Sequence, residues 1–126
     1  MSPSAAERDV LFKTFGRAWF KRDAELLYEV VTPDFAWQSN DADGRVRRIT
    51  GKSDVAAALS ATASGLVQRR FEDVVYHHAA DATFMTFRLL ETDKATGAMR
   101  EEWGVERYTF KDGRITLKDV YRKPAA

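Results

Sequence analysis

One segment late in the chain carries side chains whose spacing could place acid–base chemistry on one face of a strand. Glu102, Gly104, Glu106 and Tyr108 alternate along a run rich in aromatic residues, and alternate residues of a strand point to the same side. A carboxylate in a low-dielectric pocket keeps its charge beside cations and acts there as a base or an anchor. Without cation partners its pKa rises, and the same group can donate a proton. If Glu106 faces the interior, it is the candidate acid–base group.

This segment belongs to a predicted hairpin that we expect at the centre of a curved sheet. Asp112-Gly113 separates two β-rich runs, and Asp-Gly favours a tight hairpin because both central residues of a type I′ turn need positive φ. Upstream we expect two further long strands, residues 67–78 and 83–92, joined to the hairpin by a turn at 93–97. The second half of the chain is therefore predicted to be almost entirely antiparallel β-structure.

The first half of the chain indicates three helices and a short hairpin. Ser4 and Glu7 form a capping box for a helix that runs to about Lys21. Its expected inner face comprises Val10, Leu11, Phe15, Ala18 and Trp19. Asp23 caps an expected helix from Ala24 to Val31 that ends before Pro33. The remaining expected elements are strands at 35–38 and 46–49 and a helix capped by Ser53 that stops at Gly65.

The length of the chain and the order of its expected elements predict one α+β domain, residues 1–126, with helices gathered on one face of an antiparallel sheet. The net charge is +1, which gives no sign of a nucleic-acid or membrane partner. There are no cysteines, so a disulfide framework, a thiolate zinc site and a cysteine nucleophile are excluded. The N-terminal residues lack the apolar run of a signal peptide, and we expect a cytoplasmic protein.

Four segments, in this order and spacing, carry a resemblance to a known superfamily. They are Lys21-Arg22-Asp23-Ala24, Val31-Thr32-Pro33-Asp34-Phe35-Ala36-Trp37, Thr50-Gly51-Lys52-Ser53-Asp54-Val55 and Tyr108-Thr109-Phe110-Lys111-Asp112-Gly113-Arg114-Ile115. With them, nearly the whole chain resembles the nuclear transport factor 2-like superfamily, which includes ketosteroid isomerases and SnoaL-like polyketide cyclases. The resemblance implies a cone-shaped, curved, mostly antiparallel sheet with three helices on its concave face. It also implies a pocket between helices and sheet, and a homodimer formed through the sheet.

The resemblance also implies positions for catalytic groups. The tyrosine, base and protonated acid of the ketosteroid isomerases fall on Phe15, Ser39 and Glu106. Only Glu106 keeps a carboxyl group, which argues against steroid isomerisation. The catalytic aspartate of the limonene epoxide hydrolases falls on Val120, beside an Asp119 that points the other way. That chemistry is not supported either.

The family register predicts which charged groups surround Glu106. It turns Phe84, Thr86, Arg88 and Leu90 inward from one neighbouring strand, and Lys118, Val120 and Arg122 from the other. Arg88 is then the expected charge partner of Glu106. The alternative is a cross-strand ion pair between Arg88 and Glu106 on a partly open face, of modest energetic worth and without function.

Several aromatic residues have two interpretations. Trp19, Tyr28, Trp37 and Trp103 could line an apolar pocket, but large aromatics more often build a core or an interface. His77 and His78 are adjacent in a strand and point to opposite faces, so they cannot bind one metal together. A catalytic histidine and a solvent-facing or dimer-interface histidine both fit the sequence.

Two functions from different classes follow. The first is a SnoaL-like enzyme that acts on a small apolar molecule by proton transfer, as an isomerase, cyclase or dehydratase, without metal or organic cofactor. Glu106 and Arg88 are its expected catalytic residues. The expected binding residues are Phe15, Trp19, Tyr28, Trp37, Ser39, Tyr108, Lys118 and Val120. The second function is a non-catalytic domain of the same fold that binds a small ligand or a protein partner.

Overall fold

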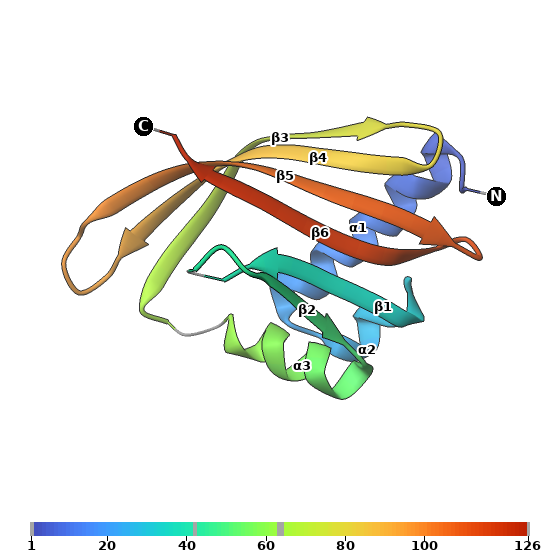
Figure 1. Ribbon diagram of the computed structural model, residues 1–126, viewed down its shortest axis with the longest axis horizontal. Helices are drawn as coiled ribbons and strands as arrows, with labels where there is room; N and C mark the ends of the chain where they lie inside the picture. The colour runs from blue at the N-terminus through green and yellow to red at the C-terminus, as the bar shows by residue number, and fades with distance from the viewer. Residues whose placement is uncertain (1, 42, 63–64, 126) are drawn as a thin grey trace.

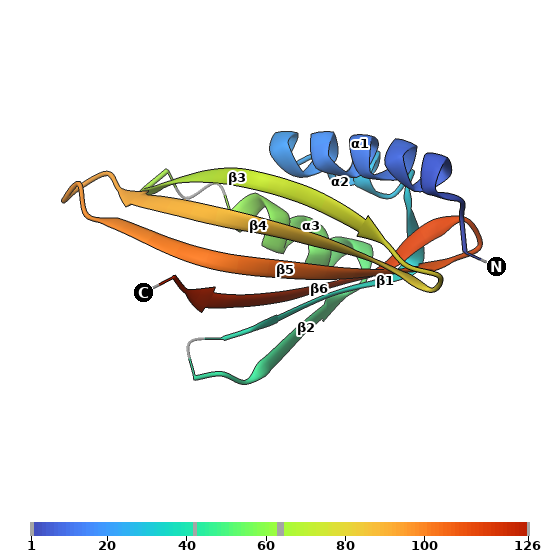
Figure 2. The same cartoon turned by 90° about the horizontal axis from the view of Figure 1, so that it is seen from above.

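A computed structural model of the chain describes residues 2–41, 43–62 and 65–125. In these residues a six-stranded sheet has the strand order β2-β1-β6-β5-β4-β3. The strands are β1 (Val31–Asn40), β2 (Val46–Thr50), β3 (Val67–His78), β4 (Ala82–Asp93), β5 (Met99–Lys111) and β6 (Arg114–Pro124). Every neighbouring pair is antiparallel except β1 and β6, which are parallel. The sheet is curved and open, and the helix α1 (Ala5–Lys21) lies along its concave face (Figures 1 and 2).

The start of α1 is the predicted capping box. The Ser4 amide donates to Glu7 Oε1 over 2.9 Å, and the Glu7 amide donates to Ser4 Oγ over 3.2 Å. These two bonds satisfy amides that have no partner within the helix. The helix ends at Arg22, which has the left-handed φ of 53°.

The buried face of α1 differs in part from the predicted one. Phe15 and Ala18 are buried as expected, but Val10 is 67% exposed and Phe12 is only 4% exposed. The sequence offered two overlapping apolar stripes at helical spacing, and the sheet covers the one that contains Phe12. The prediction for Val10 was therefore wrong.

The second helix is shorter than predicted. Asp23 caps it as expected, but α2 spans only Ala24–Leu27, and the strand β1 begins at Val31. Val31 pairs with Ile115 of β6, and the Ile115 amide donates to the Val30 carbonyl over 3.0 Å. Sheet pairing by β-branched residues thus replaces the last predicted helical turn. Pro33 lies at the irregularity between Val31 and Ala36, where a missing amide is tolerated.

The third helix, α3, spans Lys52–Ala61, and its N-cap is Gly51 rather than the predicted Ser53. Gly51 has a φ of 86°, which glycine adopts without the steric penalty of a side chain. Val55 and Leu59 face the core and are fully buried. No helix of the described residues is long and apolar enough to cross a membrane.

The Asp112-Gly113 turn is confirmed. Both residues have positive φ, 53° and 75°, and Lys111 pairs with Arg114 across the turn. Beyond the turn the β5–β6 register shifts by one residue between Phe110 and Thr109, so that Tyr108 lies opposite Lys118 and Glu106 opposite Val120.

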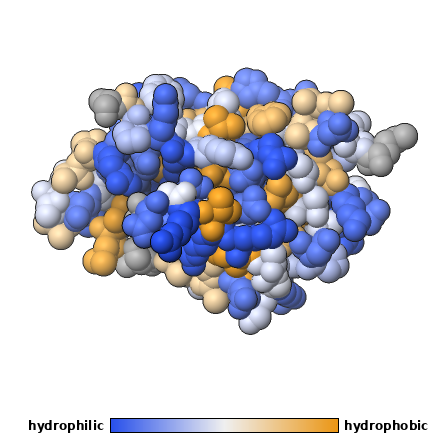
Figure 3. All heavy atoms as spheres, viewed as in Figure 1, coloured by the Kyte–Doolittle hydropathy of each residue, from blue (hydrophilic) through white to orange (hydrophobic). Residues whose placement is uncertain are grey.

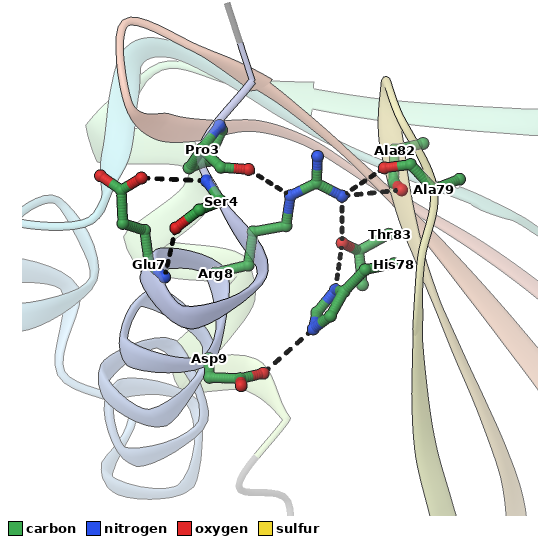
Figure 4. Close-up of polar contacts among 9 residues, drawn as sticks. All are labelled: Pro3, Ser4, Glu7, Arg8, Asp9, His78, Ala79, Ala82 and Thr83. Atoms are coloured by element: carbon green, nitrogen blue, oxygen red, sulfur yellow. Dashed lines mark hydrogen bonds and ion pairs between the residues drawn. The ribbon is translucent and has the colours of Figure 1, made fainter.

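The buried side chain of Arg8 connects α1 to the turn between β3 and β4 through hydrogen bonds (Figure 4). Arg8 Nη1 donates to the carbonyls of Ala79 and Ala82 over 2.6 and 3.1 Å, and to Thr83 Oγ1 over 3.2 Å. His78 bridges Thr83 Oγ1 and Asp9 Oδ1 over 2.9 and 3.0 Å. No local pattern of residues predicts a buried position for Arg8.

Candidate functional site

Three polar side chains meet on the inner face of the two central strands. Lys118 Nζ on β6 donates to Glu106 Oε1 on β5 over 2.7 Å. The Tyr108 hydroxyl donates to the same oxygen, and Lys118 Nζ lies 3.3 Å from that hydroxyl. The β5–β6 register brings them together, since Tyr108 is opposite Lys118 and Glu106 is two residues away on the same face. We call Glu106, Tyr108 and Lys118 the inner triad.

The inner triad is removed from water. Glu106 and Tyr108 are each 2% exposed, and Lys118 is 6% exposed. Glutamate and lysine are almost never this buried unless they are paired. Each therefore depends on the other for charge compensation, with the tyrosine hydroxyl as an additional donor to the carboxylate.

Aromatic rings from α1 and β1 cover the triad. Lys118 Nζ lies 4.2 Å from the ring centroid of Trp19 and 5.5 Å from that of Phe15. Trp37, which lies beside Lys118 in the parallel β1–β6 register, meets Trp19 edge to face with centroids 4.7 Å apart. Trp19 and Trp37 thus form an aromatic cover over the amine of Lys118.

Burial shifts the pKa of two members of the triad. Desolvation, followed by the charge of Glu106, raises the pKa of Tyr108 well above its usual 10.0. Desolvation lowers the pKa of Lys118 from 10.5, and the attraction of Glu106 opposes this without cancelling it. Both shifts favour the neutral form of the group.

Arg88 does not lie where the sequence placed it. On β4 the buried residues are Thr83, Met85, Phe87, Leu89 and Glu91, so Arg88 points to the helix-free face. There it pairs with Glu72 at 2.5 Å, Glu101 at 3.3 Å and Asp73 at 3.5 Å. The expected pairing of Arg88 with Glu106 was wrong, and Lys118 is the charge partner of Glu106.

The facing of β4 that the family register predicted is wrong by one residue. In the structure Thr92 pairs with Met99 and Met85 with Glu106. Moving a strand by one residue transfers all its side chains to the other face. The inward residues of β4 are consequently Met85, opposite Glu106, and Thr83, opposite Tyr108, rather than Phe84, Thr86, Arg88 and Leu90.

The remaining predicted binding residues lie at varying distance from the triad. Val120 is buried opposite Glu106. Ser39 is partly exposed and pairs with Arg47 of the edge strand β2. Tyr28 packs against the core with Lys52 Nζ 5.7 Å from its ring centroid, and it has no described contact with the triad. Trp103 is 46% exposed and alternates with Glu102 and Gly104, so the idea that it lines a pocket was wrong.

Two residues near the site were missed. Phe12 packs its ring against Tyr108, with centroids 4.8 Å apart, and against Tyr76, 4.9 Å apart. Burial and the charge of Glu106 raise the pKa of Tyr76. For Phe12 the available signal was its place three residues before Phe15, which puts both rings on one face of the helix.

Neither of two surface depressions in the described part of the chain touches the triad. One, of about 470 Å³, lies between β2 and α3 and is lined by Arg47, Ile49, Asp54 and Ala58 among others. The other, of about 300 Å³, lies beside Glu91 and Arg100. Among the residues outside the gaps at 42 and 63–64, no group of three or more histidine or acidic side chains could hold a metal ion.

The fold, together with a buried acid–base cluster beneath α1, defines a class of small α+β domains, and sequence comparison identifies the family. A family model described as the SnoaL-like domain matches residues 12–118. The chain belongs to the SnoaL-like domain family, within the nuclear transport factor 2-like superfamily. No curated protein sequence matches it.

Solved structures share the fold at low sequence identity. An NTF2-like protein from Burkholderia xenovorans has a TM-score of 0.77 at 20% identity, over 95% of this chain and 92% of that one. A protein from Xanthomonas campestris, provisionally assigned as a polyketide cyclase, has a TM-score of 0.72 at 16% identity over 92% and 90%. An epoxide hydrolase of Mycobacterium tuberculosis has a TM-score of 0.66 at 19% identity over 96% and 86%.

Proposed function

We propose that this SnoaL-like domain is an enzyme that moves a proton on a small apolar molecule bound beneath α1. The observation that carries the proposal is the inner triad, a carboxylate that shares one oxygen with a phenol and an amine in a water-excluded site. Family membership supports an enzymatic role at the level of the class, because relatives of this fold include a named epoxide hydrolase.

Glu106 is the proposed proton acceptor. When it takes a proton, its oxygen needs fewer hydrogen-bond donors, so Tyr108 and Lys118 become available to an oxygen of the substrate. Two donors aimed at an oxygen that gains negative charge stabilise the transition state of enolisation in a low-dielectric site. The same groups return the proton at another carbon, which is an isomerisation, or expel a hydroxyl group, which is a dehydration.

The cover of Trp19 and Trp37 sets the substrate class. A molecule that enters the site must displace the ring of Trp19 from the Lys118 amine, which lies 4.2 Å from the ring centroid. Apolar, flat molecules recover these contacts by stacking, whereas strongly hydrated ones do not. We therefore propose a small apolar, partly unsaturated substrate and an opening motion of the two tryptophans.

The test uses 5-nitrobenzisoxazole, an apolar ring that opens to a coloured phenolate when a base removes one proton from carbon. We expect turnover by the wild type and a loss of about 100-fold or more in Glu106→Gln, as for removal of a general base. Glu102→Gln is the matched control, because Glu102 lies on the same strand and face but outside the triad. Equal turnover in Glu106→Gln and the wild type contradicts the proposal.

The second candidate function is a non-catalytic ligand-binding domain. It is favoured by Phe15 and Ser39, which stand where the ketosteroid isomerases have their tyrosine and base, and by the closed aromatic cover. Quenching of tryptophan fluorescence by the same nitrobenzisoxazole separates the two functions. If the domain only binds ligands, the wild type does not turn over nitrobenzisoxazole, and Glu106→Gln binds it with the affinity of the wild type.

We also propose that two copies associate through the helix-free face. Val75, Val105 and Tyr121 are 48%, 37% and 55% exposed and lie in one row across the sheet with Thr86. On this face, apolar residues are interspersed with charged ones (Figure 3). Sedimentation velocity should show a dimer that Val105→Asp dissociates and that Val46→Asp, on the edge strand, does not.

A further inference from the structure

If the only role of Lys118 were to neutralise the charge of Glu106, an arginine would serve better than a lysine. An arginine would remain charged and could bind a carboxylate through two parallel bonds. A lysine offers one property that an arginine lacks, which is that it can lose its proton and expose a nucleophilic lone pair. The structure places such an amine in a fully buried position, 2.7 Å from a carboxylate that can accept the proton.

The surroundings of Lys118 favour the neutral amine. Burial lowers the pKa of Lys118, the positive charge of Arg122 lowers it further, and the charge of Glu106 acts in the opposite direction. Tyr108 faces the amine from β5 without carrying a charge near neutral pH, since burial holds the pKa of Tyr108 well above 10.0. The other contacts of the amine come from Phe15 and Trp19 of α1, and Trp37 of β1 packs on Trp19; none of these three is ionisable. Lysines that form covalent intermediates are activated by such desolvation.

We propose that Lys118 is a catalytic nucleophile that forms an iminium ion with the carbonyl carbon of a small apolar aldehyde or ketone. This inference rests on the site of the proposed function and assigns its substrate class as a carbonyl compound. It also provides a stronger electron sink for the same proton transfers, because an iminium ion acidifies the neighbouring C–H bonds more than a neutral carbonyl group does.

The covalent step balances with the groups of the triad alone. Lys118 first passes a proton to Glu106, and its lone pair then forms the N–C bond as the carbonyl π bond breaks. One N–H proton moves to the former carbonyl oxygen and gives a carbinolamine. The C–O bond breaks next, the proton on Glu106 leaves with the hydroxyl group as water, and the nitrogen lone pair forms the C=N bond. Tyr108, 3.3 Å from Nζ, is placed to hydrogen-bond the departing oxygen.

Reductive trapping tests this inference. The folded wild type is incubated at pH 7 with benzaldehyde and sodium cyanoborohydride, whose hydride converts an iminium ion into a stable secondary amine. Peptide mass spectrometry then gives the labelling rate of each lysine. Lys52 and Lys111 are exposed comparators in the same molecule. We expect labelling of Lys118 to be at least about tenfold faster than theirs, since one unit of pKa changes the amine fraction tenfold.

Two variants test whether the aromatic cover limits access of the reagents to Lys118 and whether Glu106 takes part in the reaction. Trp19→Ala removes one half of the aromatic cover and should raise the labelling rate of Lys118 further, while Glu106→Gln should lower it by removing the acid that protonates the departing hydroxyl group. Labelling of the denatured protein establishes that the Lys118 peptide is detected. If Lys118 reacts no faster than Lys52 and Lys111 in both the wild type and folded Trp19→Ala, the inference is overturned.

The outcomes of trapping and of the nitrobenzisoxazole assay are independent. Trapping at Lys118 without base-catalysed ring opening supports the nucleophile and contradicts Glu106 as the base for that probe. Ring opening that depends on Glu106, without selective trapping, retains the proposed proton transfer and rejects the iminium chemistry.

Discussion

Among the residues that the structure describes, two cationic side chains are buried, and their partners differ in kind. Arg8, 4% exposed, is held by backbone carbonyls and a threonine hydroxyl, none of which titrates. Lys118, 6% exposed, is held by a carboxylate and a phenol, which both titrate. The comparison teaches that burial of charge does not by itself indicate a functional site. A site for proton chemistry needs a buried group that can change its charge, with partners that can take or give the proton.

The largest loss of stability is expected when one member of the Glu106–Lys118 ion pair is replaced by an apolar residue. Glu106→Leu leaves the Lys118 charge buried without a partner and should destabilise the fold by about 3–5 kcal/mol. Adding Lys118→Met should restore most of the loss, because an apolar pair of similar volume is often neutral or stabilising. Urea unfolding of both variants measures this, and equal stability of the single and double variants would show that the two residues are not coupled.

The second largest loss of stability is expected on removing the buried cation Arg8. Arg8→Met removes the charged donor from the carbonyls of the β3–β4 turn and should destabilise the protein by about 3 kcal/mol, on the order of one or two charge-assisted hydrogen bonds. Arg17→Met, at an exposed position of the same helix, is the control. Urea midpoints of the two variants are compared. Because Arg8 lies outside the triad, nitrobenzisoxazole turnover per folded molecule should not change, and a loss of turnover would mean that the two sites are linked.

The pH dependence of stability should distinguish the two cations. The pKa of Lys118 is lower in the folded than in the unfolded state, so between these values the unfolded state binds more protons and stability rises with pH. The rise amounts to about 1.4 kcal/mol for each unit of separation and ends near 10.5, the ordinary lysine value. The Glu106→Leu/Lys118→Met variant should lack this rise, whereas Arg8→Met should retain it. Unfolding free energies between pH 7 and 10 are the measurement.

The smallest effect is expected at Arg88. It has three carboxylate partners but lies on the helix-free face, where solvent screens each pair. Arg88→Gln should therefore shift the urea midpoint far less than Arg8→Met, although both remove a cation with several partners. It should leave nitrobenzisoxazole turnover unchanged, and a large loss of turnover would restore Arg88 to the catalytic role that its sequence position suggested.

The parts of the fold that were predictable from sequence are those encoded by neighbouring residues. The capping box of Ser4 and Glu7 and the Asp112-Gly113 turn need only local geometry, and both are confirmed. The inward orientation of Glu106, Tyr108 and Lys118 was expected from the family register and does not follow from the turn alone, because an irregularity between Thr109 and Phe110 shifts the β5–β6 pairing by one residue.

The errors come from choices that distant contacts decide. The facing of Arg88 was taken from the family register and was wrong by one residue, because the loop between β4 and β5 has no sharp turn signal that fixes the pairing of these strands from sequence. Likewise, α1 has more apolar residues than one face requires, and only packing on the sheet selects Phe12 over Val10. The burial of Arg8 depends on a turn more than seventy residues away, which no local pattern reports.

The parallel pairing of β1 with β6 has a consequence for how the molecule assembles. Val31 meets Ile115, and Trp37 meets Lys118, so one half of this contact is synthesised long before the other. Contacts of such sequence separation slow folding, because a long loop must close before they form. During synthesis the helices and the β1–β2 hairpin leave the ribosome first, and β1 cannot pair with β6 until the end of the chain has been made. The carboxylate, the amine and the cover over them therefore come together only after β6 has been synthesised, and a partly synthesised chain lacks the complete inner triad.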